Sequence, residues 1–161
     1  MDKGYVQVFC GKGDGKSSAA FGKGLIAAGE GKNVIIVQFL KEQIGSETPF
    51  FKRLEPEIKL FRFEKSAACF NELSKEDRLE EITNIRNGLN YAKKVLTTGE
   101  CDLLVLDEVL GLIDRGIIDV AELLPILEAR SEDVSLLLTG IVLPDVIKKY
   151  VDTISVVEAL A

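Results

Sequence analysis

A glycine-rich turn near the start of the chain combines the residue types that bind phosphate. It reads GKGDGKS from Gly11 to Ser17 and stands between an apolar run and a helix-like segment. Glycines let a turn wrap closely around an anion, and the first amides of a helix have no partner within the helix. Lys16 can neutralise phosphate charge, and the hydroxyl of Ser17 can reach a bound Mg²⁺. The sequence therefore predicts a site for the phosphates of ATP, with magnesium.

The turn is one residue shorter than the Walker loop of most P-loop proteins. That loop has four residues between its first glycine and the Gly-Lys pair, whereas Gly11 and Gly15 enclose three, so Cys10 stands where the glycine would be. We expect a shorter phosphate cradle for this reason. The residues expected to contact the nucleotide are those of the turn and its neighbour: Gly11, Lys12, Gly13, Asp14, Gly15, Lys16, Ser17 and Ser18.

A pair of acidic residues, Asp107 and Glu108, follows the apolar run CDLLVL. A carboxylate at the carboxyl end of a buried parallel strand points into the crevice where ligands of such folds bind. The pair is therefore expected to hold Mg²⁺ together with Ser17, directly or through water, as a Walker B element does. An apolar run ending in Asp-Glu is common, so a helix cap or a solvated turn is the alternative interpretation of the pair alone.

Apolar runs alternate with helix-length amphipathic segments, which is typical of a parallel sheet wrapped by helices. We expect a P-loop NTPase-like (RecA-like) α/β fold, with five or six mostly parallel strands and helices on both faces. Residues 1–161 should form one domain, because this length and a hydrophobic content of 47% can build a sizeable core. Strands are expected at 5–10, 33–40, 101–106, 135–139 and 154–157, with a possible edge strand at 58–63, and helices at 16–28, 75–96, 119–130 and 144–150, the third of them bent at Pro125.

Composition excludes several classes of function. The chain has 20 basic and 26 acidic residues and no basic block, so the electrostatic footprint of a nucleic-acid-binding protein is missing. Histidine is absent, which removes Ser-His and Cys-His nucleophiles and argues against zinc. No apolar run approaches the length needed to cross a bilayer. The three cysteines, Cys10, Cys69 and Cys101, are expected to be free thiols of a cytoplasmic protein.

These motifs and their surroundings resemble the ATP:corrinoid adenosyltransferases of the CobA/BtuR/CobO type over most of the chain. That family has the same shortened loop, G-N-G-K-G-K-T-T, followed by A-A-F-G, which is Ala19 to Gly22 here. Its V-Q-F-I-K segment corresponds to Val37 to Lys41, its V-L-D-E to Val105 to Glu108, and its T-G to Thr139 and Gly140. A stretch similar to A-D-T-V-S lies at residues 151–155.

The resemblance implies adenosyl transfer, in which a Co(I) corrinoid attacks the 5′ carbon of ATP and the triphosphate departs. It implies that Lys16, Lys41 and Glu108, with Mg²⁺, stabilise the leaving charge, and that Gln38 belongs to the cofactor-binding residues. It also implies a homodimer and a possible reductase partner. Since cobalt is the nucleophile, the lack of histidine is no obstacle.

The chain departs from the family pattern at several places, beginning with Lys12 in place of the loop asparagine. Asp14 replaces a loop lysine, Ile141 replaces the arginine of a T-G-R motif, and no tryptophan is available for the corrinoid-facing segment. The neighbourhood of Phe63 and Phe70 is the remaining source of aromatic side chains for that segment.

Two other functions stay open at this point. The first is an ordinary P-loop phosphohydrolase or kinase, in which Glu108 would orient water or a substrate hydroxyl. The second is a non-catalytic binder of ATP or corrinoid, which the missing arginine and tryptophan would fit.

Overall fold

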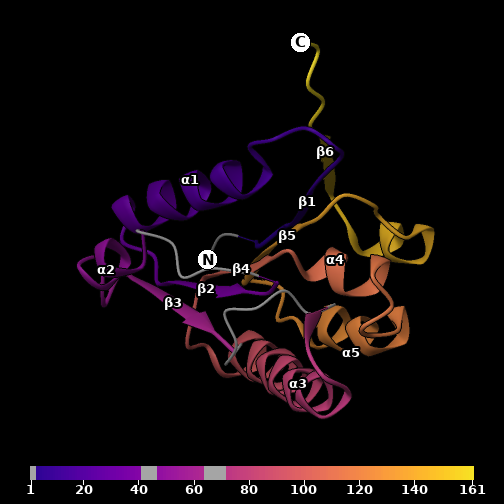
Figure 1. Cartoon of the computed structure of the whole chain (residues 1–161). Coiled ribbons are helices and arrows are strands. Elements are labelled where there is room, and N and C mark those ends of the chain that lie inside the picture. Colours follow the sequence, from indigo (N-terminus) through magenta and orange to yellow (C-terminus); the bar gives the residue numbers. More distant parts are fainter. Residues whose placement is uncertain (1–2, 41–46, 64–71) are drawn as a thin grey trace.

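The described residues form one sheet of six parallel strands. In the computed structural model, which describes residues 3–40, 47–63 and 72–161, the strand order is β3-β2-β4-β5-β1-β6. Helices cover both faces of the sheet (Figure 1). The predicted fold class, a mostly parallel α/β sheet of five or six strands with helices on both faces (Figure 1), is therefore confirmed.

The strands are β1 (Val6–Cys10), β2 (Val34–Gln38), β3 (Ile58–Arg62), β4 (Leu103–Asp107), β5 (Ser135–Thr139) and β6 (Thr153–Val156). The helices are α1 (Lys16–Gly29), α2 (Glu47–Lys52), α3 (Lys75–Thr98), α4 (Val109–Asp114), α5 (Val120–Ala129) and the 3-10 helix η2 (Asp145–Tyr150). Because all strands are parallel, their carboxyl ends form one edge of the sheet, and the loops that carry function start there.

Alternate residues of each strand supply two separate cores. On one face, β-strand residues such as Phe9, Ile36 and Val105 pack with the helix α1 residues Ala20 and Ala27. On the other face, the second and larger set of strand residues packs with α3, α4 and α5. The strands are therefore buried on both sides, which explains their continuous apolar runs.

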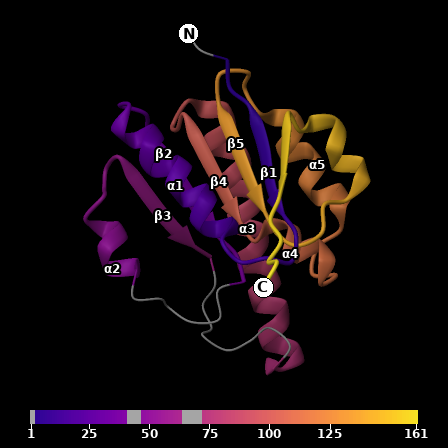
Figure 2. The same ribbon diagram turned by 90° about the horizontal axis from the view of Figure 1, so that it is seen from above.

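Helix α3 reaches beyond the carboxyl edge of the sheet, as Figure 2 shows. A Cβ atom on Gly88 would lie only 3.0 Å from the rings of Phe39 and Phe63, so α3 crosses the ends of β2 and β3 at close range there. The turns of α3 that precede Gly88 consequently stand beside the loops of this edge.

Several predicted elements differ from the structure. The segment after Pro144 is a 3-10 helix, because Ile147 N donates to the Pro144 carbonyl three residues earlier and Val151 already starts the turn into β6. The short helices α2 and α4 were not predicted, since six residues are too few to show helical periodicity. Helix α5 runs through Pro125 without a break.

In the part of the chain that is described, no helix is both long enough and apolar enough to span a membrane.

Candidate functional site

Four polar side chains lie in one row at the carboxyl edge of the sheet. Gln38 is the register partner of Arg62 on one side and of Asp107 on the other. Thr139 ends β5, next to β4. Alternation along the strands puts these side chains on the face that α1 covers, because the residues before them in each strand belong to the opposite core. The row therefore opens toward the start of α1.

Asp107 is the centre of the hydrogen bonds in this row. Ser17 Oγ donates to Asp107 Oδ1 at 2.6 Å, and Thr139 Oγ1 donates to the same oxygen at 2.9 Å. The carboxylate is fully buried, with 0% of its surface exposed. Its other oxygen, Oδ2, has no hydrogen-bond partner among the described residues. A buried acceptor left open in this way is expected to receive a ligand.

Glu108 begins the turn into α4 in the left-handed conformation, with a φ of 62°. Its amide donates to Thr139 Oγ1 at 2.8 Å, so Thr139 links both acidic residues. The side chain lies over the first turn of α4, because Glu108 Oε2 would be 3.0 Å from a Cβ on Gly111. Gly140 has to be small, since its Cβ would lie 2.4 Å from Leu110 Cβ.

The turn between β1 and α1 offers a set of amides to an anion. The amides of Gly15, Lys16, Ser17 and Ser18 have no acceptor within the described ranges of the chain. Lys16 Nζ donates to the Gly13 carbonyl at 2.6 Å, which keeps the ammonium group over the turn. Free amides at a helix start, with a cation beside them, form an anion site.

The three glycines of the turn are required for different reasons. A Cβ on Gly11 would approach the Val157 carbonyl oxygen at 2.4 Å, and a Cβ on Gly13 would lie 2.9 Å from the same oxygen. Gly13 N donates to that carbonyl at 2.9 Å, and Val157 N donates to Cys10 O at 2.7 Å. Gly15 has a φ of 103° with no atom within 4 Å of its Cβ position. Gly11 and Gly13 thus admit the chain's own residues after β6, whereas Gly15 faces open space.

Gln38 is 1% exposed and has one satisfied and one open amide atom. Its Oε1 accepts from Arg62 Nε at 2.8 Å. Its Nε2 is buried and has no partner in the ranges that the structure describes. Sequence reasoning did not single out Arg62 or the hydrogen-bonding role of Thr139, because neither has a local signal and both act through neighbouring strands.

The residues singled out from the sequence lie in different surroundings. Lys16, Ser17, Asp107 and Glu108 meet at the carboxyl edge, and Gln38 stands next to Asp107 in the row. Lys12 and Asp14 are exposed on the turn, as is Ser18 on α1. Lys41, Cys69 and Phe70 lie outside the described residues. Phe63 packs against Tyr91 with ring centres 5.8 Å apart.

A magnesium ion fits the donors at this edge. Among the residues described, no group of three His, Cys, Asp or Glu side chains is placed to hold a metal ion. Mg²⁺ is usually bound by one or two carboxylates, with phosphate oxygens and waters completing its shell. The open Oδ2 of Asp107, in the carboxylate that Ser17 Oγ contacts, can meet that requirement directly or through a water of the metal shell.

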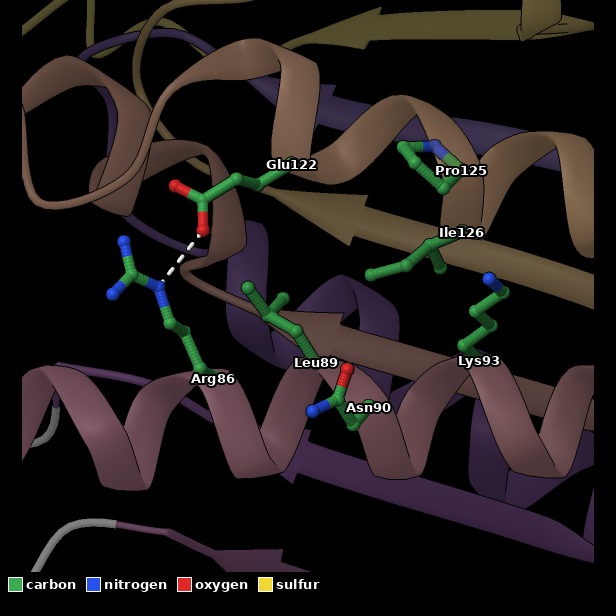
Figure 3. Close-up of a pocket in the computed structure, with 7 residues that line it drawn as sticks. All are labelled: Arg86, Leu89, Asn90, Lys93, Glu122, Pro125 and Ile126. Atoms are coloured by element: carbon green, nitrogen blue, oxygen red, sulfur yellow. Dashed lines mark hydrogen bonds and ion pairs between the residues drawn. The ribbon is translucent and has the colours of Figure 1, made fainter.

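A separate hollow of about 280 Å³ lies between α3 and α5, on the face opposite α1. Figure 3 shows Arg86, Asn90 and Lys93 of α3 below it and Glu122 of α5 above it. Arg86 Nε pairs with Glu122 Oε1 at 2.9 Å. None of the predicted site residues lines this hollow.

The chain is similar in sequence to known corrinoid adenosyltransferases. The chain is 29% identical over 139 residues to the corrinoid adenosyltransferase of Escherichia coli (strain K12), which covers 86% of this chain and 68% of that protein. It is 30% identical over 139 residues to the corrinoid adenosyltransferase CobA of Salmonella typhimurium, with coverages of 86% and 68%. The enzyme of Pseudomonas aeruginosa is 29% identical over 140 residues, with coverages of 86% and 67%. Since residues 2–160 also match the family as a whole, the chain belongs to the ATP:corrinoid adenosyltransferase BtuR/CobO/CobP family.

Proposed function

We propose that the protein transfers the 5′-deoxyadenosyl group of ATP to the Co(I) centre of a corrinoid and releases triphosphate. The observation that carries the proposal is the hydrogen-bonded unit of Ser17, Asp107 and Thr139 beside the open amides of the α1 start, in a chain of this family. In the reaction the electron pair of Co(I) forms the Co–C bond, and the C5′–O bond breaks with its electrons going to the triphosphate.

The work of the protein in this reaction is to position ATP and stabilise the leaving charge. The amides of residues 15–18 would bind triphosphate oxygens, because they are unpaired in the described chain and stand at the positive end of α1. Lys16 Nζ, now bonded to the Gly13 carbonyl, would exchange this acceptor for a phosphate oxygen. Lys41 is proposed to add a second cation.

Ser17, Asp107 and Glu108 are the residues that would hold Mg²⁺. When bound, Mg²⁺ supplies positive charge that offsets the charge of the departing triphosphate. Thr139 keeps Asp107 and Glu108 in place, since it donates to the carboxylate of the first and accepts from the amide of the second. No side-chain nucleophile is needed, because the attacking atom belongs to the corrinoid.

The direct test is anaerobic incubation of the protein with MgATP and cobalamin reduced to Co(I). Formation of the Co–C bond, followed by absorbance, with release of intact triphosphate is the expected outcome. A Lys16→Met variant should lose most of the rate, whereas a Lys32→Met variant should keep it, since Lys32 is exposed at the far end of α1.

Product analysis separates this function from its alternatives. A phosphohydrolase or kinase would release phosphate or ADP, and a non-catalytic binder would bind ATP and corrinoid without turnover. Either result, obtained with protein that binds MgATP, would contradict the proposed adenosyl transfer.

The family resemblance further suggests a homodimer, a reductase partner that supplies Co(I) and a cytoplasmic location. The exposed apolar side chains of Ile154 and Val156 on the edge strand β6 support a contact between copies of the chain. Buried free thiols at Cys10 and Cys101 are in keeping with a reducing compartment. Sedimentation velocity at several protein concentrations tests the dimer.

A further inference from the structure

Two buried polar atoms of opposite hydrogen-bonding character are open at the same place in the sheet. Asp107 Oδ2 is an acceptor and Gln38 Nε2 is a donor, and neither has a partner within the described part of the protein. Both side chains are almost completely buried, at 0% and 1% exposure. A buried polar atom without a partner is rare, because it costs the protein its full desolvation penalty.

The two residues are direct neighbours. Gln38 and Asp107 are register partners on β2 and β4, and their side chains stand on the α1 face. Neighbouring strands lie about 4.8 Å apart, so side chains at partner positions on one face are close together. The two atoms are nevertheless not bonded to each other. A separation of this order is bridged by one oxygen atom that makes two hydrogen bonds.

The direction of the Gln38 amide is fixed by β3. Arg62 Nε donates to Gln38 Oε1, which turns the oxygen of the amide toward Arg62 and leaves Nε2 as the end available to another group. Ser17 and Thr139 both donate to Oδ1 of Asp107, so Oδ2 is the carboxylate oxygen that stays available. In each of the two side chains, hydrogen bonds to one terminal atom thus fix the position of the other, open atom.

We propose that Asp107 Oδ2 and Gln38 Nε2 together bind one O–H group of the nucleotide–magnesium complex. An O–H group donates to the carboxylate and accepts from the amide, so it satisfies both atoms at once. Such a group can come from a water of the metal shell or from a sugar hydroxyl. The inference rests on the proposed function, because it assumes that ATP and Mg²⁺ bind at this edge, and it makes Gln38 a positioning residue with a specific partner.

A second buried glutamine provides a matched control. Gln7 lies on β1, is also largely buried, and has both amide atoms bonded: its Nε2 donates to Ser155 Oγ at 3.0 Å and its Oε1 accepts from Lys23 Nζ. It is three residues from the end of its strand and has no open atom. Replacing it changes the same kind of side chain without touching the open pair.

The experiment compares Gln38→Met with Gln7→Met by calorimetric titration and by thermal unfolding. Gln38→Met should bind MgATP about tenfold more weakly than wild type, because the O–H group loses its donor. Gln7→Met should bind MgATP as wild type does. In the ligand-free protein the order reverses: Gln7→Met should lower the melting temperature more, since it breaks two hydrogen bonds whereas Gln38→Met breaks one and removes an unsatisfied donor.

The choice of ligand distinguishes a metal-bound water from a sugar hydroxyl as the source of the O–H group. If it is a metal-bound water, Gln38→Met weakens magnesium tripolyphosphate as well as MgATP and leaves binding of metal-free ATP unchanged. If it is a sugar hydroxyl, magnesium tripolyphosphate is unaffected, and 2′-deoxy-ATP or 3′-deoxy-ATP binds equally to wild type and variant. Either pattern supports the proposal.

Equal MgATP affinity for wild type and Gln38→Met would overturn the inference while leaving the proposed function intact. Equal weakening of every ligand, metal-free tripolyphosphate included, would also overturn it, as would the same loss in Gln7→Met. Failure of the wild-type protein to bind MgATP would instead remove the proposed function. Should Gln38→Met fold poorly, Gln38→Leu serves in its place, because it also removes the donor and adds no charge beside Asp107.

Discussion

Ser17 Oγ donates a 2.6 Å hydrogen bond to Asp107 Oδ1 and so ties the first turn of α1 to the carboxyl end of β4, although 90 residues separate the two in sequence. The helix start proposed to bind phosphate and the carboxylate proposed to bind Mg²⁺ are therefore joined directly. A change in either residue is therefore expected to alter the binding of ATP in the presence of magnesium.

Asp107→Asn should weaken magnesium-dependent ATP binding by about 10–100-fold, which is the usual effect of disturbing a metal site. The variant has the same shape and keeps an oxygen for Ser17 and Thr139, so the protein should stay folded. Calorimetric titration of ATP with and without Mg²⁺ measures the effect. Metal-free binding should change little, and an unchanged magnesium dependence would show that Asp107 is not a ligand.

Gly13→Ala should destabilise the protein by about 1–3 kcal/mol, because the new Cβ would press on the backbone of Val157 and Glu158. The residues after β6 should then be cleaved faster by proteases. Gly22→Ala is the matched control: Gly22 is inside α1 with no atom near its Cβ position, so the change should stabilise by roughly 0.5–1 kcal/mol. Urea unfolding of both variants checks the prediction, which fails if the two behave alike.

Cys101 should resist alkylation in the folded protein. Burial raises the pKa of its thiol to about 12, with smaller contributions from the charges of Asp102 and Glu100, so the reactive thiolate is almost absent at mildly alkaline pH. Iodoacetamide labelling followed by peptide mass spectrometry should find Cys101 unmodified in buffer and modified in concentrated urea. Rapid labelling of the native protein at this residue would contradict the buried position.

The Arg86–Glu122 pair beside the hollow in Figure 3 should make stability fall slightly in acid. The hydrogen bond from Arg86 lowers the pKa of Glu122 below its ordinary value of 4.5. The contribution is therefore complete above that value and is lost as the pH falls through the lower pKa of the folded state. Because both side chains are partly exposed, it should be at most about 1 kcal/mol. Urea unfolding of wild type and Glu122→Gln should differ at neutral pH and converge in acid.

Most of the sheet could be predicted because parallel strands buried on both faces appear as continuous apolar runs. Strand β4 differs from the predicted strand 101–106 by two residues at its start and by one at its end. Strand β5 has the predicted bounds, 135–139. Helix α3 was predicted from its long periodic pattern and is two residues longer than expected. Helices α2 and α4 could not be predicted because each has only six residues. The sequence does not distinguish the 3-10 helix η2 from an α-helix, because Pro144 is compatible with the start of either kind.

The turn and the acidic pair could be found from local sequence, because each is a short motif with its own chemistry. The partners that complete the row could not. Arg62 reaches Gln38 from the neighbouring strand β3, and Thr139 reaches Asp107 from the neighbouring strand β5, so their roles depend on register rather than on spacing along the chain. The close approach of residues 157–159 to Gly11 and Gly13 could not be predicted either, because it depends on where β6 ends beside the turn. The expectation that Gly11, Gly13 and Gly15 contact the phosphate stays a prediction. The roles of Lys12, Asp14, Lys41 and Gln38 toward the nucleotide stay predictions.

The position of β1 has a consequence for synthesis on the ribosome. This strand precedes the other five described strands along the chain, yet it pairs with β5 and β6, the last two of them, and the turn that follows it is held by Val157. In a nascent chain β2, β3 and β4 can therefore pair with one another before β5 and β6, the neighbours of β1, have been synthesised. Competence to hold a nucleotide should arise only when the final strand has emerged, so ribosome-bound chains arrested before residue 153 should not retain ATP.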